Sequence, residues 1–254
     1  SMKLKNKVAI VTGSSRGIGK AIALAFAREG ATVTIAARTA IESKLITGTI
    51  YKTADEIRTF GGNVLPIKTD VTDVKEVEVM VQKTIDNFKR VDILVNNAAN
   101  NRPALLKDMP LKHWDTIIGV NLRGPVVCTK AVLPIMMDQK EGHIINISSI
   151  VARMLHHEPM TGLAYDVSKA AIDRFTRGLA EELKEYRIAV NALMPDNTDT
   201  EGWSYLNPTL DKSGWQKPEI WGAYAVFVAT RDTTTFTGKI LSEEDLKKEC
   251  AQAD

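Results

Sequence analysis

The chain has 254 residues, of which 44% are hydrophobic and 25% are charged, and its formal net charge is +2. This charge is too small to favour nucleic acid or an anionic membrane as a partner, and no apolar run approaches the roughly 18 residues that a membrane span needs. The first residues lack the apolar segment of a signal peptide, and the two cysteines and four histidines lack the spacing of metal ligands. We therefore expect a cytoplasmic protein with no metal site and with no nucleic-acid or membrane partner.

Short apolar runs alternate with helical segments along the chain. We predict strands at 7–12, 32–36, 64–67, 91–95, 143–147, 188–193 and 237–241. Predicted helices lie between them at 19–28, 53–60, 74–88, 111–137, 165–186 and 219–229, and we expect Pro125 to kink or interrupt the fourth. The strands are apolar throughout, which is typical of parallel strands buried on both faces. The pattern predicts an α/β fold, a Rossmann-type doubly wound parallel sheet in a single domain spanning 1–254.

A glycine-rich turn follows the first strand, at the sheet edge where doubly wound folds bind their ligands. Its sequence, T-G-S-S-R-G-I-G, contains Gly13, Gly17 and Gly19 and opens a helix. Glycines allow a pyrophosphate to approach the backbone, and the helix N-terminus supplies unpaired N–H groups. We therefore predict a phosphate site here, in preference to a turn with only a structural role.

The end of the second strand predicts which nicotinamide cofactor binds. An acidic residue there would bind a ribose 2′-hydroxyl, whereas an arginine accommodates a 2′-phosphate. The chain has Arg38 at this place, and Arg38 with Arg16 of the glycine turn could clamp a phosphate. The alternative is that Arg38 is a solvated loop charge. We expect NADP(H) in preference to NAD(H).

Tyr165 and Lys169 are four residues apart at the start of a predicted helix, so they share one face of it. A cation beside a phenol favours the phenolate, which makes the pair a candidate acid/base unit. Taken alone, this spacing is common, and the ordinary interpretation is a surface tyrosine and a solvated lysine.

The motifs together, and in this order, resemble the short-chain dehydrogenase/reductase family over nearly the whole chain. The turn Thr12–Gly19 resembles the cofactor turn of that family, and the tetrapeptide N-N-A-A at 96–99 resembles its Asn-Asn-Ala-Gly signature, with Ala99 in place of glycine. The resemblance implies hydride transfer between a nicotinamide and a carbonyl or secondary alcohol. It assigns catalysis to Asn121, Ser149, Tyr165 and Lys169, with Lys169 lowering the pKa of Tyr165 and Asn121 holding a water behind Lys169. With the turn and the two arginines, the implied cofactor site comprises Gly13, Ser15, Arg16, Gly17, Ile18, Gly19, Arg38, Asp70, Val71, Asn97, Ala98, Tyr165, Lys169, Pro195 and Thr198.

Three departures from the usual family pattern stand out. The connection at 39–51 and the gap between Ser149 and Tyr165 are long, and Asp196 follows Pro195 where many members have glycine. With the T-I-Y sequence at 49–51, these features resemble the hydroxysteroid-dehydrogenase-like branch. The departures at Ala99 and Asp196 are the only support for an alternative function, a non-catalytic NADP-binding sensor or scaffold of the same fold.

Two segments are expected to shape the substrate pocket, 150–163 and a lid at about 196–218. Their aromatic and apolar side chains either contact a small apolar carbonyl or alcohol substrate or pack the lid against the domain. His156 and His157 lie in the first segment and either contact substrate or are exposed. The predicted helices at 111–137 and 165–186 carry more apolar surface than one sheet face needs, so by the resemblance we expect a homodimer or homotetramer.

Overall fold

The computed structural model describes residues 2–42, 46–154 and 162–252. Within this part of the chain, seven parallel strands form one sheet in the order β3-β2-β1-β4-β5-β6-β7. They are β1 (Val8–Thr12), β2 (Thr32–Ala37), β3 (Val64–Lys68), β4 (Ile93–Asn96), β5 (Gly142–Ile147), β6 (Ile188–Leu193) and β7 (Ile240–Leu241). The order reverses between β1 and β4, and ligands bind doubly wound sheets beyond the carboxyl ends of the strands at such a reversal.

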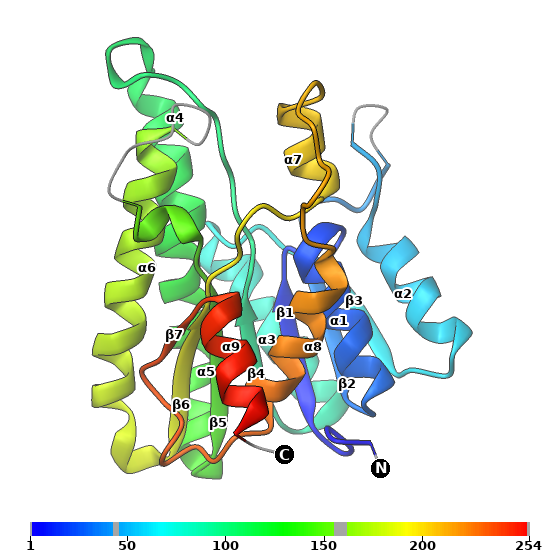
Figure 1. The fold of residues 1–254 in the computed structure, drawn as a ribbon. Helices are drawn as coiled ribbons and strands as arrows, with labels where there is room; N and C mark the ends of the chain where they lie inside the picture. Colours follow the sequence, from blue (N-terminus) through cyan, green and yellow to red (C-terminus); the bar gives the residue numbers. More distant parts are fainter. Residues whose placement is uncertain (1, 43–45, 155–161, 253–254) are drawn as a thin grey trace.

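Helices cover both faces of the sheet (Figure 1). One face carries α1 (Gly17–Arg28), α2 (Ile50–Thr59), α8 (Pro218–Ala229) and α9 (Glu243–Ala251). The other carries α3 (Val74–Phe88), α5 (Gly124–Gln139) and α6 (Leu163–Glu182). Each face encloses its own apolar core, and this arrangement confirms the predicted doubly wound α/β fold.

The apolar runs of the sequence follow from this double coverage. In β1, Ala9 and Val11 belong to the core beneath α1 and α8, whereas Ile10 belongs to the core beneath α3 and α5. Successive side chains of a strand point to opposite faces. Because helices cover both faces, every position of β1 must be apolar or internally bonded, and Thr12 meets this requirement by donating its hydroxyl to the Val95 carbonyl at 3.1 Å.

Several element bounds differ from the prediction for local reasons. Helix α2 begins at Ile50 instead of residue 53, because the Thr49 hydroxyl caps it by accepting a bond from the Lys52 N–H at 3.1 Å. Strand β7 has two residues where five were predicted. At its predicted start the Thr237 side chain, and not a backbone group, accepts the Val190 N–H at 3.0 Å. Helix α6 begins at Leu163 and ends at Glu182, and the last predicted turn is the separate short helix η4 (Lys184–Tyr186).

The predicted helix at 111–137 is interrupted directly before Pro125, which is the second of the two expected effects of this proline. The run consists of α4 (Leu111–Ile118), a π-helical turn η2 (Gly119–Arg123) and α5, and Pro125 lies in the first turn of α5. The N–H of Gly124 donates to the carbonyl of Gly119, which is the wider π spacing. Proline has no N–H to pair with the carbonyl four residues earlier, that of Asn121. The wide turn therefore lies where α-helical pairing is already interrupted.

The same run, Leu111–Gln139, is by length and composition able to span a membrane, because its most apolar window of 18 residues has a mean hydropathy of 1.2. The sequence analysis missed it because scattered polar residues interrupt the run. In this structure 44% of its most apolar window is buried against the rest of the fold. Helices that pack on the sheet of a globular protein pass the same test, so this one helix is weak support for a membrane segment.

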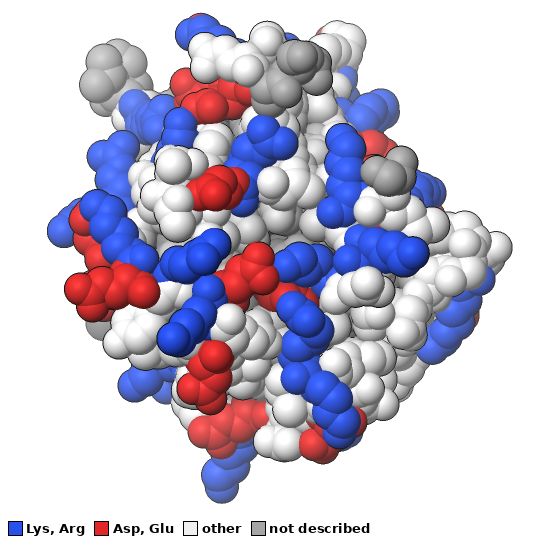
Figure 2. Space-filling view, turned by 90° about the horizontal axis from the view of Figure 1, so that it is seen from below, with Lys and Arg blue, Asp and Glu red and all other residues white. Residues whose placement is uncertain are grey.

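The end of the sheet at which the strands begin carries both signs of charge, interspersed over one face (Figure 2). There Asp92, which is 2% exposed, accepts the Val8 N–H at 2.8 Å and pairs with Arg90. Lys7 pairs with Glu141 at 3.1 Å. These bonds tie β1, β4 and β5 together at the end opposite to the one where ligands are expected.

Candidate functional site

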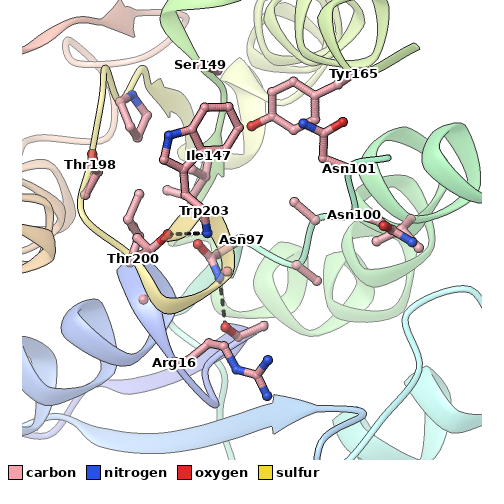
Figure 3. A pocket seen from close by; sticks show the side chains of 18 of the residues that line it. Arg16, Asn97, Asn100, Asn101, Ile147, Ser149, Tyr165, Thr198, Thr200 and Trp203 are labelled. Carbon is pink, nitrogen blue, oxygen red and sulfur yellow. Dashed lines mark hydrogen bonds between the residues drawn. The ribbon is translucent and has the colours of Figure 1, made fainter. Parts of the chain in front are cut away.

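A cavity of about 790 Å³ opens at the carboxyl ends of the strands. Its size is within the range usual for cofactor and ligand sites. Among the residues that the structure describes, the predicted cofactor residues all line this cavity except Gly19. Of the four predicted catalytic residues, Ser149, Tyr165 and Lys169 line it and Asn121 does not. Figure 3 shows how several of these side chains converge.

Hydrogen bonds between Thr12 and Gly13 on one side and Asn97 and Ala98 on the other join the turns after β1 and β4 at the cavity, and we call this set of bonds the lock. The Asn97 amide donates to the carbonyls of Thr12 at 2.9 Å and Gly13 at 3.1 Å. In return, the Thr12 hydroxyl accepts the N–H groups of Asn97 at 3.0 Å and Ala98 at 3.1 Å. A Cβ on Gly13 or Gly19 would overlap the Asn97 side chain. Gly19 does not line the cavity, and a glycine is needed there because a Cβ would displace the Asn97 side chain.

The first turn of α1 already holds an anionic group. The N–H of Gly17 donates to Oε2 of Glu201 at 2.9 Å, and Glu201 belongs to α7 (Glu201–Leu206) in the predicted lid. Arg16 donates from Nη2 to the Gly48 carbonyl at 3.0 Å, while its Nε is buried and has no partner within the described residues. Burial lowers the pKa of Arg16, and the Glu201 carboxylate opposes this shift. An unpaired cationic donor beside a helix N-terminus fits a phosphate-bearing cofactor.

Arg38 lies at the same cavity and is 57% exposed in its side chain. Its Nη1 is 3.8 Å from Oδ2 of Asp70, and Oδ1 of Asp70 accepts the Thr72 N–H at 2.9 Å. The two arginines predicted to form a phosphate clamp are thus both at the cavity, and their guanidinium groups have different partners.

The catalytic candidates come from β5 and α6. Ser149, just beyond β5, lines the cavity together with Tyr165, and its hydroxyl acts to lower the pKa of the Tyr165 phenol. Nζ of Lys169 donates to the Ile147 carbonyl at 2.7 Å and lies 5.4 Å from the centre of the Tyr165 ring. Ser148, the residue before Ser149, instead donates its hydroxyl to Oδ1 of Asp173 at 2.5 Å. This division supports Ser149, and not Ser148, as the serine beside the tyrosine.

The pKa balance differs from the predicted one. We expected Lys169 to lower the pKa of Tyr165, but burial raises the pKa of Tyr165 to about 12, and the bond from Ser149 is the contribution that opposes it. Burial also lowers the pKa of Lys169 to about 8, against the attraction of Asp173. Tyr165 is therefore a protonated phenol at neutral pH.

Asn121 acts from behind the cavity. Its side chain, 1% exposed, accepts the Asn100 N–H at 2.7 Å and donates to the Asn100 carbonyl at 3.0 Å. It also donates to the Ser168 hydroxyl on α6 at 3.0 Å. Asn121 thus joins the loop after β4 to the helix that carries Tyr165 and Lys169, which is a positioning role.

The sequence model of the short chain dehydrogenase family matches residues 7–211. The chain belongs to this family. Its curated relatives include hydroxysteroid dehydrogenase-like protein 2 of Danio rerio, 38% identical over 97% of this chain and 59% of the relative. The same protein of Homo sapiens is 37% identical over 97% of this chain and 59% of the relative. The chain thus spans about three-fifths of the length of these relatives, and the family model confirms the predicted family.

Solved structures of other family members share the fold. A short-chain type dehydrogenase/reductase from Mycobacterium marinum has a TM-score of 0.84 at 30% identity, covering 95% of both chains. A mutant short-chain dehydrogenase/reductase of Serratia marcescens has a TM-score of 0.83 at 30% identity, covering 94% of this chain and 97% of its own. Family and fold together place this short chain dehydrogenase among the oxidoreductases.

In this short chain dehydrogenase the predicted lid faces the cavity with part of its aromatic surface. Trp203 and Tyr205 of α7 line the cavity, while Trp215 packs against Trp203 with ring centres 6.3 Å apart. Trp203 and Tyr205 are thus open to the space where a substrate could bind, and Trp215 packs within the lid. Residues 155–161, which include His156 and His157, lie outside the described residues. Within the described ranges, no group of three or more His, Cys, Asp or Glu side chains is placed to hold a metal ion.

Three residues of the site were missed by the sequence analysis. Glu201 reaches the site because of where the lid lies, and no sequence motif predicts that position. Asp173 lies four residues after Lys169 on the same helix face, so helical spacing could have identified it. Asn101 directly extends the N-N-A-A motif as part of an asparagine pair, which is a signal that we did not use.

Proposed function

We propose that this short chain dehydrogenase is an NADP(H)-dependent oxidoreductase that interconverts a carbonyl group and a secondary alcohol. The supporting observation is the position of Ser149, Tyr165 and Lys169 in the same cavity as the glycine turn. The reactive side chains and the residues suited to a dinucleotide thus share one space, as a hydride transfer requires. A bound NADPH supplies the hydride, and the side chains of this chain carry out the remaining steps.

In the direction of reduction, Tyr165 donates a proton to the substrate oxygen. The high pKa of Tyr165 keeps the phenol protonated at neutral pH, and Ser149 is placed to hydrogen-bond the same oxygen. Lys169, as a buried cation, stabilises negative charge that develops on the phenol. In the reverse direction the same tyrosine accepts the proton.

The preference for NADP(H) over NAD(H) rests on Arg16 and Arg38. Both line the cavity beyond β1 and β2, and Nε of Arg16 is buried without a described partner. A 2′-phosphate would give these guanidinium groups an anionic partner. Each arginine has an acidic neighbour in this arrangement, Asp70 for Arg38 and Glu201 for Arg16.

The test is binding of NADPH and of NADH to the purified protein, measured by quenching of tryptophan fluorescence or by calorimetry. We expect NADPH to bind more tightly, and Arg38→Ala to weaken NADPH by roughly tenfold or more while changing NADH little. Arg58→Ala, at an exposed arginine of α2 paired with Asp55, is the control. Equal affinity for both nucleotides would contradict the preference, and binding of neither would contradict the oxidoreductase itself.

The alternative, a non-catalytic NADP-binding sensor or scaffold, predicts a different result. Such a protein would bind NADPH and turn over no carbonyl or alcohol in a broad screen. The position of Ser149, Tyr165 and Lys169 around one cavity favours the enzyme, because a scaffold has no need of this arrangement. We further propose an apolar-bodied carbonyl or alcohol substrate, since Ile150, Val151 and Leu206 line the cavity.

We also propose a homodimer or homotetramer formed through the outer faces of α5 and α6. Val167 on α6 is 42% exposed, which is consistent with an apolar contact at this face. Light scattering coupled to size-exclusion chromatography measures the mass directly, and a monomeric mass at micromolar concentration would contradict the assembly.

A further inference from the structure

Asn101 carries the most unusual polar group of the cavity. Both atoms of its side-chain amide, Oδ1 and Nδ2, are buried, and neither has a hydrogen-bond partner among the described residues. Buried amides are nearly always paired, so an unpaired one in a native fold needs a reason. The cost is larger here because a donor and an acceptor are both left without partners.

Two other asparagine amides in this protein show the normal pattern, and a third, Asn96, lacks a partner on Oδ1 only. Asn191, which is 1% exposed, donates to the Phe236 carbonyl at 2.9 Å and accepts the Lys239 N–H at 3.0 Å. Asn97 likewise donates from Nδ2 to two backbone carbonyls, which join two turns. These amides stabilise the fold. Asn101 makes no such bond, so its amide has no comparable structural role.

Asn101 is nevertheless held in a fixed place. The preceding peptide, at Asn100, is bonded on both its N–H and its carbonyl by the Asn121 side chain. The Asn101 amide and the Tyr165 hydroxyl project into the same part of the cavity (Figure 3). Nε1 of Trp203, across the cavity on α7, is also buried without a described partner. Both unpaired atoms of the Asn101 amide therefore belong to the part of the cavity where a substrate would meet Tyr165.

We propose that Asn101 is a specificity-determining residue that binds a second polar group of the substrate, near the carbonyl that is reduced. This inference rests on the proposed function. An amide both donates and accepts, so the matching group is one that also does both, such as a neutral hydroxyl. A carboxylate can only accept hydrogen bonds, so it would leave Oδ1 of Asn101 without a donor and would be repelled by it. The next residue, Arg102, does not offset this, because it is exposed and its Nη1 contacts His113 at 3.1 Å.

The expected selectivity follows from the cost of leaving buried polar atoms unpaired. A site built to hydrogen-bond a substrate hydroxyl discriminates strongly against the analogue that lacks it, because the site is then left with unpaired groups. The rest of the substrate body can still be apolar, as the lining from Ile150 and Leu206 suggests. The substrate class is thus a hydroxy ketone, or the corresponding diol in the reverse reaction.

The test compares matched ketones that differ in one hydroxyl. Acetophenone, 2-hydroxyacetophenone and 3-hydroxy-1-phenylpropan-1-one share a ring and a carbonyl, and benzoylformate places a carboxylate beside the carbonyl. For each, kcat/KM is measured with NADPH, and binding is measured by calorimetry to the protein with NADP+, where no reduction takes place. We expect one hydroxy ketone to exceed acetophenone at least about tenfold in both measurements, and benzoylformate to show no such advantage.

Asn101→Leu removes the amide and keeps a similar volume, so it should abolish the preference while acetophenone is handled as before or better. The same variant should unfold at a higher temperature than the native protein, because it replaces an unpaired buried amide with an apolar group. Asn87→Leu, at an exposed asparagine of α3, is the control and should alter neither property.

Three results would overturn the inference: no hydroxy ketone exceeds acetophenone, benzoylformate is the best of the four, or the preference survives in Asn101→Leu. These results differ from failure of the proposed function. A protein that fails to bind NADPH, or that binds it and reduces none of the four ketones, contradicts the enzyme as well as the role of Asn101.

Discussion

The N–H of Gly17 donates to the carboxylate of Glu201 across 184 positions of sequence, at 2.9 Å. Gly17 starts α1 with a φ of +54°, a conformation that favours glycine, and Glu201 starts α7 in the lid. A negative charge from the chain itself thus lies where the positive end of a helix would receive a phosphate. The glycine turn and the lid are therefore in direct contact through the protein's own residues, without a ligand.

This coupling predicts that Glu201→Gln binds NADPH more tightly than the native protein. The amide keeps the bond to Gly17 and removes a negative charge that repels the cofactor phosphates. We expect an increase of roughly twofold to tenfold, in line with the size of charge effects at helix ends. Calorimetric titration measures it, with Glu219→Gln, an exposed glutamate in the first turn of α8, as the control. Unchanged or weaker binding would show that Glu201 does not compete with the cofactor.

Tyr165→Phe should abolish most of the turnover and leave cofactor binding nearly intact. General acid catalysis by a positioned group is typically worth 10²–10⁴-fold, and the substitution removes only the phenolic hydroxyl. Steady-state reduction of a good ketone substrate measures the loss, and fluorescence titration measures NADPH affinity. Tyr186→Phe, at the exposed tyrosine of η4, should behave like the native protein. A Tyr165→Phe protein with near-native kcat would remove Tyr165 from the mechanism.

The buried Lys169 predicts a pH dependence of stability. Its pKa falls from 10.5 to about 8 on folding, so between these values the unfolded chain binds more protons than the folded one. Stability contributed by this group therefore rises with pH, by about 2 kcal/mol between pH 8 and 9.5. Above pH 10 the raised pKa of Tyr165 acts in the opposite direction, because the folded protein then retains a proton that the unfolded chain loses.

Urea unfolding of the native protein and of Lys169→Met at pH 7.5, 8.5 and 9.5 isolates this effect, since all other groups titrate in both. The difference in unfolding free energy should move in favour of the native protein as pH rises. A difference that stays constant over this range would show that Lys169 has an ordinary pKa in the folded state.

Pro125 and the π-helical turn before it predict a long-range effect on activity. Pro125→Ala supplies an N–H four residues after Asn121 and so allows ordinary α-helical pairing through η2. The Asn121 side chain would then rotate away from the Asn100 peptide, and we expect kcat to fall about tenfold or more with no loss of thermal stability. Pro134→Ala, within the same helix and exposed, is the matched control. Equal activities of the two variants would contradict the role of the wide turn.

The layout of the fold could be predicted from the sequence because each strand is a buried, uniformly apolar run. The short β7 could not, because its pairing depends on the Thr237 side chain replacing a backbone acceptor. The wide turn at Gly119–Arg123 was also missed, since the apolar periodicity of 111–137 continues across it. Local patterns thus identify the elements, and contacts with the rest of the fold set their ends.

The candidate site was predictable where its residues follow strand ends or share a helix face. Ser149, Tyr165 and the glycine turn meet this condition, and they line one cavity. Glu201 and Asn101 do not meet it. Glu201 is distinguished by a hydrogen bond to a backbone N–H far away in the sequence, and Asn101 by a side-chain amide without a hydrogen-bond partner among the described residues. The pKa of Tyr165 was misjudged for a related reason: helical spacing gives the neighbour Lys169, but only the packed structure gives the extent of burial.

The lock between Thr12 and Asn97 also constrains the order of folding. Its bonds join residues 85 positions apart, so they can form only after β4 has added to β1 in the sheet. A chain that has paired only β1, β2 and β3 has the glycine turn in sequence but lacks the amide that fixes its shape. Loop closure over such a distance makes this a late contact in folding. A ligand of this cavity would therefore bind the completed sheet and not its earlier intermediates. Its binding energy would stabilise only the fully assembled fold.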